Sequence, residues 1–223
     1  MISFKGAHFP KDIILSAVFF YVSYRDLEEI MAERGVKVDH AILNRWVIDY
    51  SPLIAAEAKK RKRPVASSWR MDEIFVKVKG QWVYWYRAVD KFGDTVDFML
   101  SEHRDGMATT TFFKQAINGN GFPHKIIMDK SGANYAGIEN IIRLMMLAGL
   151  ISFIETCQVK YLNNLIVQDH RFIKKITKPM MEFKAFYSAK ATIDGIETAH
   201  MIRKGQLSED SMSAYKQFMA LAG

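Results

Sequence analysis

The chain has 223 residues, of which 49% are hydrophobic, so it is long enough to bury a core of ordinary size. Its net charge of +7 favours a polyanionic partner such as nucleic acid. The single cysteine, Cys157, excludes an intrachain disulfide, and the apolar run Ile13–Val22 is too short to span a bilayer. We therefore expect a cytoplasmic protein that has no membrane partner.

The N-terminal region, residues 1–55, is predicted to be helical. Helices are expected over Lys11–Val22, Tyr24–Arg34 and His40–Tyr50. Gly35 ends the second of them, and Pro52 marks the end of the third. A helix, a glycine turn and a second helix that carries Asn44 and Arg45 form the order of a helix-turn-helix DNA reader. Helical hairpins with glycine in the turn are also common, so this order alone leaves both interpretations open.

Five consecutive cations followed by a proline, Lys59–Pro64, mark a domain boundary. The segment suits a solvated linker, a basic strap on DNA phosphates, or both. We accordingly divide the chain into a helix-turn-helix region (1–55), a basic linker (56–67), a core domain (68–178) and a C-terminal helical extension (179–223).

From Ser68 onward the apolar period changes to two, which indicates β-strands. Strands are expected over Ser68–Val78, Trp82–Val89, Thr95–Ser101, Lys125–Met128 and Leu150–Thr156. Helices are expected over Gly106–Asn118, Gly137–Ala148, Leu162–Thr177, Ala185–Lys204 and Ser211–Leu221. Three antiparallel strands followed by alternating helices and strands form the element order of a ribonuclease H-like fold. We therefore predict an α/β core with a mixed five-stranded sheet flanked by helices.

Two aspartates occupy informative places in this order. Asp72 lies within the first strand, and Asp129 directly follows the fourth. In a ribonuclease H-like fold these places hold carboxylates of a two-metal site, which clamps the attacking and leaving oxygens of a displacement at phosphorus. Carboxylate oxygens suit Mg²⁺ or Mn²⁺. Asp129 could also simply begin a turn, so the metal site is favoured by the pair rather than by either residue.

A third carboxylate would come from the helix after the fifth strand, and the position that we assign to it holds Val167. Val167 shares a polar, basic helix face with Asn164, Arg171 and Lys174, at spacings of three and four. A glutamate would suit this face, and Arg171 and Lys174 would then approach the DNA backbone beside the metals. A lone exposed valine is also ordinary on a protein surface.

Short motifs throughout the chain match one protein family. They are Phe4–Gly6, Val38–His40, Asn44–Val47, Trp69–Glu73, Val76–Gly80, Tyr86–Asp90, Asp129–Asn134, Val159–Leu165, Gln168–Arg171 and Met201–Leu207. With these motifs the chain resembles, almost end to end, the bacterial insertion-sequence transposases of family six, which carry an Asp-Asp-Glu catalytic triad.

The resemblance implies a ribonuclease H-like catalytic domain behind a helix-turn-helix region in a bacterial, nucleoid-associated protein. It implies double-stranded DNA partners, namely terminal inverted repeats and target DNA, and a homo-oligomer that is at least a dimer. Two Mg²⁺ or Mn²⁺ ions would support strand transfer by 3′-hydroxyl attack. Asp72 and Asp129 match the first two triad members, the family's glutamate falls on Val167, and Lys174 matches a basic residue seven positions later. The connection between the first two helices is also shorter than usual.

Valine cannot coordinate a metal, and Asp169 lies about 200° away around the helix. We therefore expect a transposase whose strand-transfer activity is absent or very weak. One alternative is a catalytically inactive protein that binds DNA ends and inhibits an active relative. Another is a nuclease that uses a different carboxylate, such as Glu155 at the end of the fifth strand.

Overall fold

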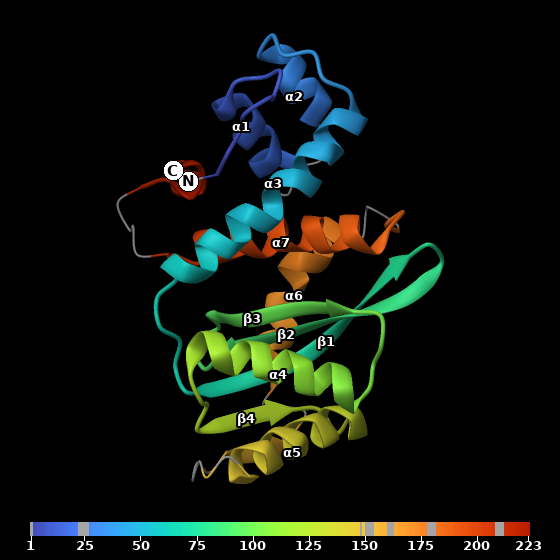
Figure 1. The fold of residues 1–223 in the computed structure, drawn as a ribbon, viewed down its shortest axis with the longest axis vertical. Helices are drawn as coiled ribbons and strands as arrows, with labels where there is room; N and C mark the ends of the chain where they lie inside the picture. The colour runs from blue at the N-terminus through green and yellow to red at the C-terminus, as the bar shows by residue number, and fades with distance from the viewer. Residues whose placement is uncertain are drawn as a thin grey trace. The chain divides into compact units, whose positions relative to one another are not determined.

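The computed structural model describes residues 2–21, 27–147, 149, 154–159, 163–177, 182–207 and 212–223 (Figure 1). The chain divides into two compact units. The helical unit comprises Met1–Arg63 and Ile176–Gly223, and the sheet unit comprises Pro64–Lys175. No helix in the described ranges combines the length and the apolar character that crossing a bilayer requires.

The helical unit is built from helices at both ends of the chain. They are α1 (Lys11–Tyr21), α2 (Leu27–Glu33), α3 (His40–Arg61), α7 (Phe186–Arg203) and α8 (Ala214–Ala220). Helix α3 begins after Asp39, whose side chain accepts a hydrogen bond of 2.8 Å from the backbone N–H of Ile42, as an N-cap should. Residues 22–26, between α1 and α2, lie outside the described part of the chain, and with them the expected short connection.

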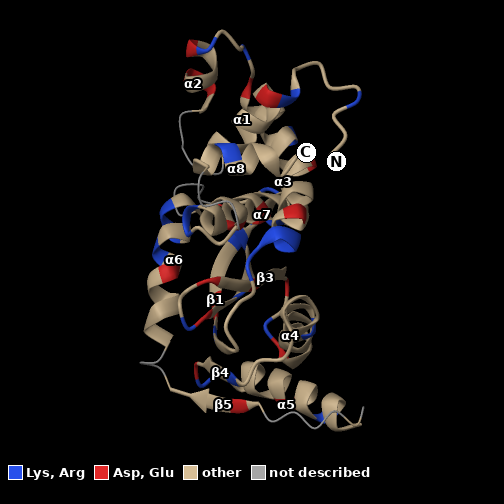
Figure 2. Cartoon of the chain, turned by 90° about the vertical axis from the view of Figure 1, so that its left-hand side faces the viewer, with Lys and Arg blue, Asp and Glu red and all other residues tan. Residues whose placement is uncertain are grey.

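The prediction that the third helix ends at Ser51-Pro52 is wrong, because α3 continues to Arg61 with Pro52 inside it. A buried apolar stripe continues across the proline, formed by Leu43, Trp46, Val47, Ile54, Ala55 and Ala58. Burying this stripe outweighs the one backbone hydrogen bond that a proline cannot donate. Residues 56–61 of the expected linker are therefore helical, and their three cations stand in the last turn (Figure 2), where the helix dipole favours positive charge.

The sheet unit contains a mixed sheet in the order β3-β2-β1-β4-β5. Its strands are β1 (Ser68–Val78), β2 (Gln81–Asp90), β3 (Thr95–Ser101), β4 (Lys125–Met128) and β5 (Glu155–Gln158). The first three strands are antiparallel, whereas β4 runs parallel to both β1 and β5. This topology confirms the predicted ribonuclease H-like fold class. The predicted fifth strand was placed too early, since residues 150–153 are outside the described ranges and the strand extends to Gln158.

Helices cover both faces of the sheet. Helices α4 (Gly106–Asn120) and α5 (Gly132–Leu147) pack on one face, and α6 (Asn164–Thr177) lies on the other side of the strands from α4 (Figure 2). A hydrophobic core lies between the sheet and helices α4 and α5. Its buried side chains include Trp69, Met71, Tyr86, Ala88, Val96, Phe112, Phe113, Ala116, Ile126, Met128, Ile138, Ile141 and Met145.

Helix α5 begins five residues earlier than the predicted start at Gly137. Gly137 is an internal helix residue that lets α4 approach closely. A Cβ atom at Gly137 would lie only 2.4 Å from the Cβ of Thr109. The glycine therefore serves helix packing and does not mark a helix start.

Candidate functional site

The register of the sheet places the two predicted aspartates level with each other. In the parallel pairing of β1 with β4, Ser68 lies opposite Lys125 and Arg70 lies opposite Ile127. Continuing this register by two residues puts Asp129 beside Asp72, and neighbouring strands are about 4.8 Å apart. The structure thus brings together the two aspartates that the sequence selected.

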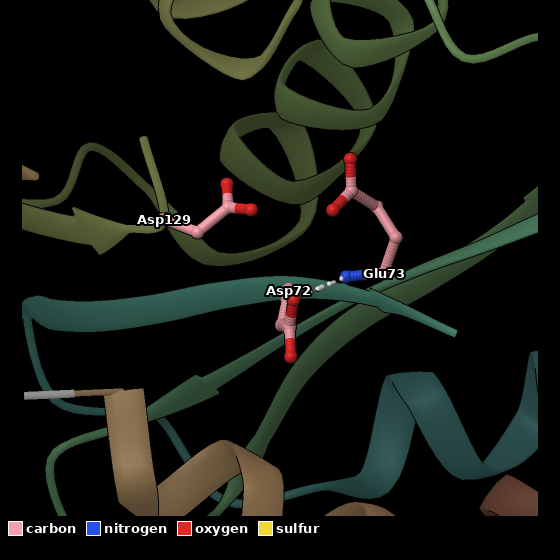
Figure 3. A group of neighbouring side chains, drawn as sticks. All are labelled: Asp72, Glu73 and Asp129. Atoms are coloured by element: carbon pink, nitrogen blue, oxygen red, sulfur yellow. Dashed lines mark hydrogen bonds between the residues drawn. The ribbon is translucent and has the colours of Figure 1, made fainter. Parts of the chain in front are cut away.

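A third carboxylate, Glu73, joins them. One side-chain oxygen from each of Asp72, Glu73 and Asp129 lies within 4.8 Å of the others. Figure 3 shows Asp72 and Glu73 leaving β1 on opposite sides, as successive strand residues do, while the carboxylates of Glu73 and Asp129 face each other. We call these three residues the carboxylate cluster.

Two of these side chains are held by neighbours. The Oδ1 atom of Asp129 accepts hydrogen bonds from the side-chain amide of Asn134 and the backbone N–H of Ser131, both of 3.1 Å. Glu73 is buried and accepts a hydrogen bond of 3.3 Å from Nε of Arg104, with which it forms an ion pair. Asn134 stands in the first turn of α5, so the early start of this helix is what presents its amide to Asp129.

Asp72 carries the electrostatic strain of the cluster. The pKa of its carboxyl is raised to about 6, chiefly by burial and also by the charges of Glu73 and Asp129, although a hydrogen bond of 2.9 Å from the backbone N–H of Glu73 opposes the rise. Burial also raises the pKa of Glu73. Carboxylates crowded in this way favour any cation that binds among them. The hard oxygen donors fit Mg²⁺ or Mn²⁺.

Two residues near position 167 contact β1 beside the carboxylate cluster. One helical turn before it, the side-chain amide of Asn163 donates a hydrogen bond of 3.0 Å to the backbone oxygen of Met71. One turn after it, Nδ1 of His170 lies 3.6 Å from Oδ2 of Asp72. Residues three and four apart share a helix face, so Val167 stands between two residues that contact β1 at the carboxylate cluster. Its side chain is 47% exposed.

A buried ion pair sets the rotation of α6. Asp169 lies 2.9 Å from the fully buried guanidinium of Arg87 on β2. Arg87 pairs directly with Asp72 across β1 and β2, so this contact holds Asp169 on the same side of the sheet as Asp72. The expectation that Asp169 cannot replace the missing ligand stays a prediction.

Glu155 does not reach the carboxylate cluster, and the interpretation that placed it at the end of the fifth strand is wrong. It is the first residue of β5, lies opposite Lys125 and forms an ion pair of 2.8 Å with it. Lys125 begins β4, whereas Asp129 follows its last residue. Four strand residues separate the two levels, or about 13 Å along the strand.

The predicted DNA-contacting residues fall in two places. Arg171 and Lys174 are exposed on α6, and Lys174 is close enough to Asp72 for its charge to favour the ionised carboxylate. Asn44 and Arg45 lie on α3 in the helical unit, where Arg45 is exposed and Asn44 is half-buried.

Sequence reasoning missed the residues that complete the surroundings of the two aspartates. They are Glu73, Arg104, Asn134 and His170. Glu73 was passed over because neighbouring strand residues point to opposite faces. The available signals were the adjacent acidic pair Asp72-Glu73 and an asparagine five residues after Asp129. The ion pair with Arg104 had no signal in the sequence, because it joins residues that are 31 positions apart.

Comparison with known proteins identifies the family of the chain. Residues 66–206 match the model of a family described as a DDE domain, of the IS240 transposase type. The transposase for the insertion sequence-like element IS431mec of Staphylococcus aureus strain N315 is 38% identical over 205 residues, which cover 90% of this chain and 88% of that protein. The transposase for insertion sequence element IS257 in transposon Tn4003 of Staphylococcus aureus shows the same identity and coverage.

Two solved structures are similar in fold to the chain. The HTLV-2 integrase catalytic core domain in complex with magnesium, in its trimeric form, has a TM-score of 0.45 and 18% identity, covering 61% of this chain and 88% of that one. The Drosophila P element transposase strand transfer complex has a TM-score of 0.42 and 12% identity, covering 98% of this chain and 65% of that one.

The family match spans all five strands, the carboxylate cluster and position 167. The relatives extend this likeness into the helical unit, because they cover 90% of the chain. The protein belongs to the Asp-Asp-Glu transposases of insertion-sequence family six, a family of enzymes.

Proposed function

We propose that the protein binds the terminal inverted repeats of its insertion sequence and the target DNA, as at least a dimer, and that its Mg²⁺-dependent strand transfer is impaired. The observation that carries the second part is position 167. Asn163, directly before α6, and His170 on α6 contact Met71 and Asp72, yet the side chain of Val167 between them offers no oxygen.

Asp72 and Asp129 are the residues that would hold Mg²⁺ or Mn²⁺, with two ions expected, and Glu73 adds charge beside them. Bound ions would stabilise negative charge at the reacting phosphate and favour ionisation of the attacking hydroxyl. Neighbouring residues of the chain hold a metal-binding carboxylate in place. Asn134 and Ser131 fix the carboxylate of Asp129 through two hydrogen bonds.

The surrounding cations would position DNA. Arg104 balances the charge of Glu73, and Arg171 and Lys174 present exposed positive charge along α6 (Figure 2). Such contacts to phosphates place a DNA strand without reading its sequence. We assign sequence reading to the region 1–55 as a helix-turn-helix reader, in which Asn44 and Arg45 on α3 approach the bases.

The test is strand transfer on a pre-cleaved oligonucleotide that carries the element's end, with Mg²⁺, comparing the natural chain with Val167→Glu. We expect transfer by Val167→Glu and little or none by the natural chain. Equal activity of both proteins would refute the role assigned to position 167. If neither protein transfers the strand although both bind the end specifically, the missing carboxylate at position 167 does not by itself account for the inactivity.

The second candidate function also follows from Val167. A chain that binds the inverted repeats without cleaving them would act as a DNA-end-binding protein and could inhibit an active relative by forming mixed oligomers. Specific binding of the repeats by the natural chain, and a fall in transposition by an active relative when the chain is co-expressed, would support this function. Loss of binding in Arg45→Ala, with transposition by the relative no longer reduced, would link the inhibition to DNA binding.

A further inference from the structure

Beyond Glu73, the same face of the β1–β2 hairpin carries a group of exposed aromatic side chains. Phe75 follows Glu73 by two residues and is 52% exposed, and Trp82 on β2 is 57% exposed. Cross-strand pairing sets Phe75 opposite Tyr84 and Lys77 opposite Trp82. We call Phe75, Trp82 and Tyr84 the aromatic platform.

The rings of the platform are packed against one another rather than scattered. The centroid of Phe75 lies 5.5 Å from that of Tyr84 and 6.5 Å from that of Trp82, with edge-to-face geometry in both pairs. Tyr84 is partly buried against the hydrophobic core of the sheet unit, so it anchors the other two rings. A single exposed aromatic residue is ordinary, whereas adjacent large rings that stay exposed indicate a contact surface.

Cations border this surface. Lys77 and Lys79 are exposed on the hairpin, and the guanidinium of Arg104 lies 5.6 Å from the ring centroid of Phe75. Arg104 also forms the ion pair with Glu73. One side chain therefore touches both the aromatic platform and the carboxylate cluster.

Exposed rings bordered by lysine and arginine are the arrangement that binds single-stranded nucleic acid, because bases stack on the rings while cations attract the phosphates. An apolar protein partner would gain nothing from these cations, which it would have to desolvate. The spacing also suits DNA. Phe75 follows Glu73 by two strand residues, or about 7 Å along the strand. This distance is about twice the rise between stacked bases.

We propose that the aromatic platform stacks the unpaired bases next to the phosphate that enters the carboxylate cluster, so that the DNA end is held open by a few nucleotides. The inference rests on the proposed function for the location of that phosphate. Stacking on Trp82 and Phe75 does not itself require metal or chemistry, so it can be measured when neither is present.

The experiment measures binding by fluorescence anisotropy in EDTA, with a labelled duplex that has a short unpaired 3′ end and a fully paired duplex of equal length. Trp82→Ala is expected to weaken binding of the unpaired end by about 5- to 100-fold, as loss of one base–aromatic stack does elsewhere, and to change binding of the paired duplex less than about twofold. Trp82→Phe should retain most of the affinity. Phe92→Ala is the matched control, because Phe92 is 74% exposed with Lys91 over its ring but lies at the β2–β3 turn.

Three results would overturn the proposal. The first is an equal loss of affinity for both DNAs. The second is no loss of affinity for the unpaired end in either Trp82→Ala or Phe75→Ala. The third is a change in self-association, measured by sedimentation, with DNA binding intact, which would make the platform a protein interface. A 2-aminopurine base in the unpaired end should lose fluorescence on binding to the natural chain and not to Trp82→Ala. Failure of strand transfer or of metal binding leaves these measurements unaffected, so the two proposals fail separately.

Discussion

Replacing Val167 by glutamate tests the site most directly, because it adds one carboxylate at a position whose helix neighbours already contact β1. Val167 is 47% exposed, so a carboxylate at this position keeps contact with solvent. Because Val167 is only partly buried, its loss costs less than the full free energy of burying a valine side chain. Glutamate is also the better helix former. Apart from metal binding, we expect the substitution to change the free energy of unfolding by less than about 1 kcal/mol.

The gain should appear in metal affinity. Outer residues that only orient a metal ligand are worth about 10- to 100-fold in affinity, so a direct carboxylate ligand should contribute at least that much. Each tenfold gain corresponds to about 1.4 kcal/mol of added stability at saturating metal, or about 3–6 °C in melting temperature for a protein of this size. Without metal, the extra charge beside Asp72 should instead lower the melting temperature above pH 6, because the pKa of Asp72 is already raised.

The assay is Mn²⁺ titration by calorimetry, with melting curves recorded in Mn²⁺ and in EDTA. Val167→Gln has the same shape without the charge, and Gln168→Glu adds the same charge at an exposed position about 100° around the helix. Only Val167→Glu should gain affinity. A similar gain in Gln168→Glu would show that general charge is sufficient, and no gain in a folded Val167→Glu would show that position 167 does not face the cluster.

Three further outcomes follow from buried contacts. In EDTA, Asp72→Asn should be more stable than the natural chain by about 2–3 kcal/mol at pH 8 and about equally stable at pH 4. The reason is that the pKa of Asp72, raised to about 6, makes the ionised carboxylate unfavourable in the folded protein. Equal stability of the two proteins at both pH values in urea titrations would contradict this. Arg87→Ala should cost about 3–5 kcal/mol because it removes the buried partner of the ion pair with Asp169, and Asp169→Asn in the same chain should recover part of that loss in a double-mutant cycle. Gly137→Ala should cost about 1–3 kcal/mol, since its Cβ would lie 2.4 Å from Thr109, and Thr109→Gly should relieve the clash in melting experiments if the reasoning is correct.

Local patterns in the sequence were sufficient for most of the sheet. Strands Ser68–Val78, Thr95–Ser101 and Lys125–Met128 begin and end where the alternation and the turn residues predict. The pairing of Asp72 with Asp129 also follows from the order of the elements, because a parallel fourth strand beside the first carries its following residue to the middle of β1. These features depend on side-chain period, turn chemistry and chain direction, all of which are local.

Other features were decided only by the tertiary structure, because they depend on contacts between residues that are far apart in the sequence. Pro52 stays inside α3 because the buried stripe on both sides of it outweighs one lost hydrogen bond. Glu73 joins the carboxylate cluster although its side chain leaves the opposite side of β1 from that of Asp72, and Asp169 is turned to Arg87, 82 residues away. Glu155 is excluded because its strand begins where β4 begins. These contacts form only when the fold brings the two residues of each pair together, so no periodicity along the chain predicts them.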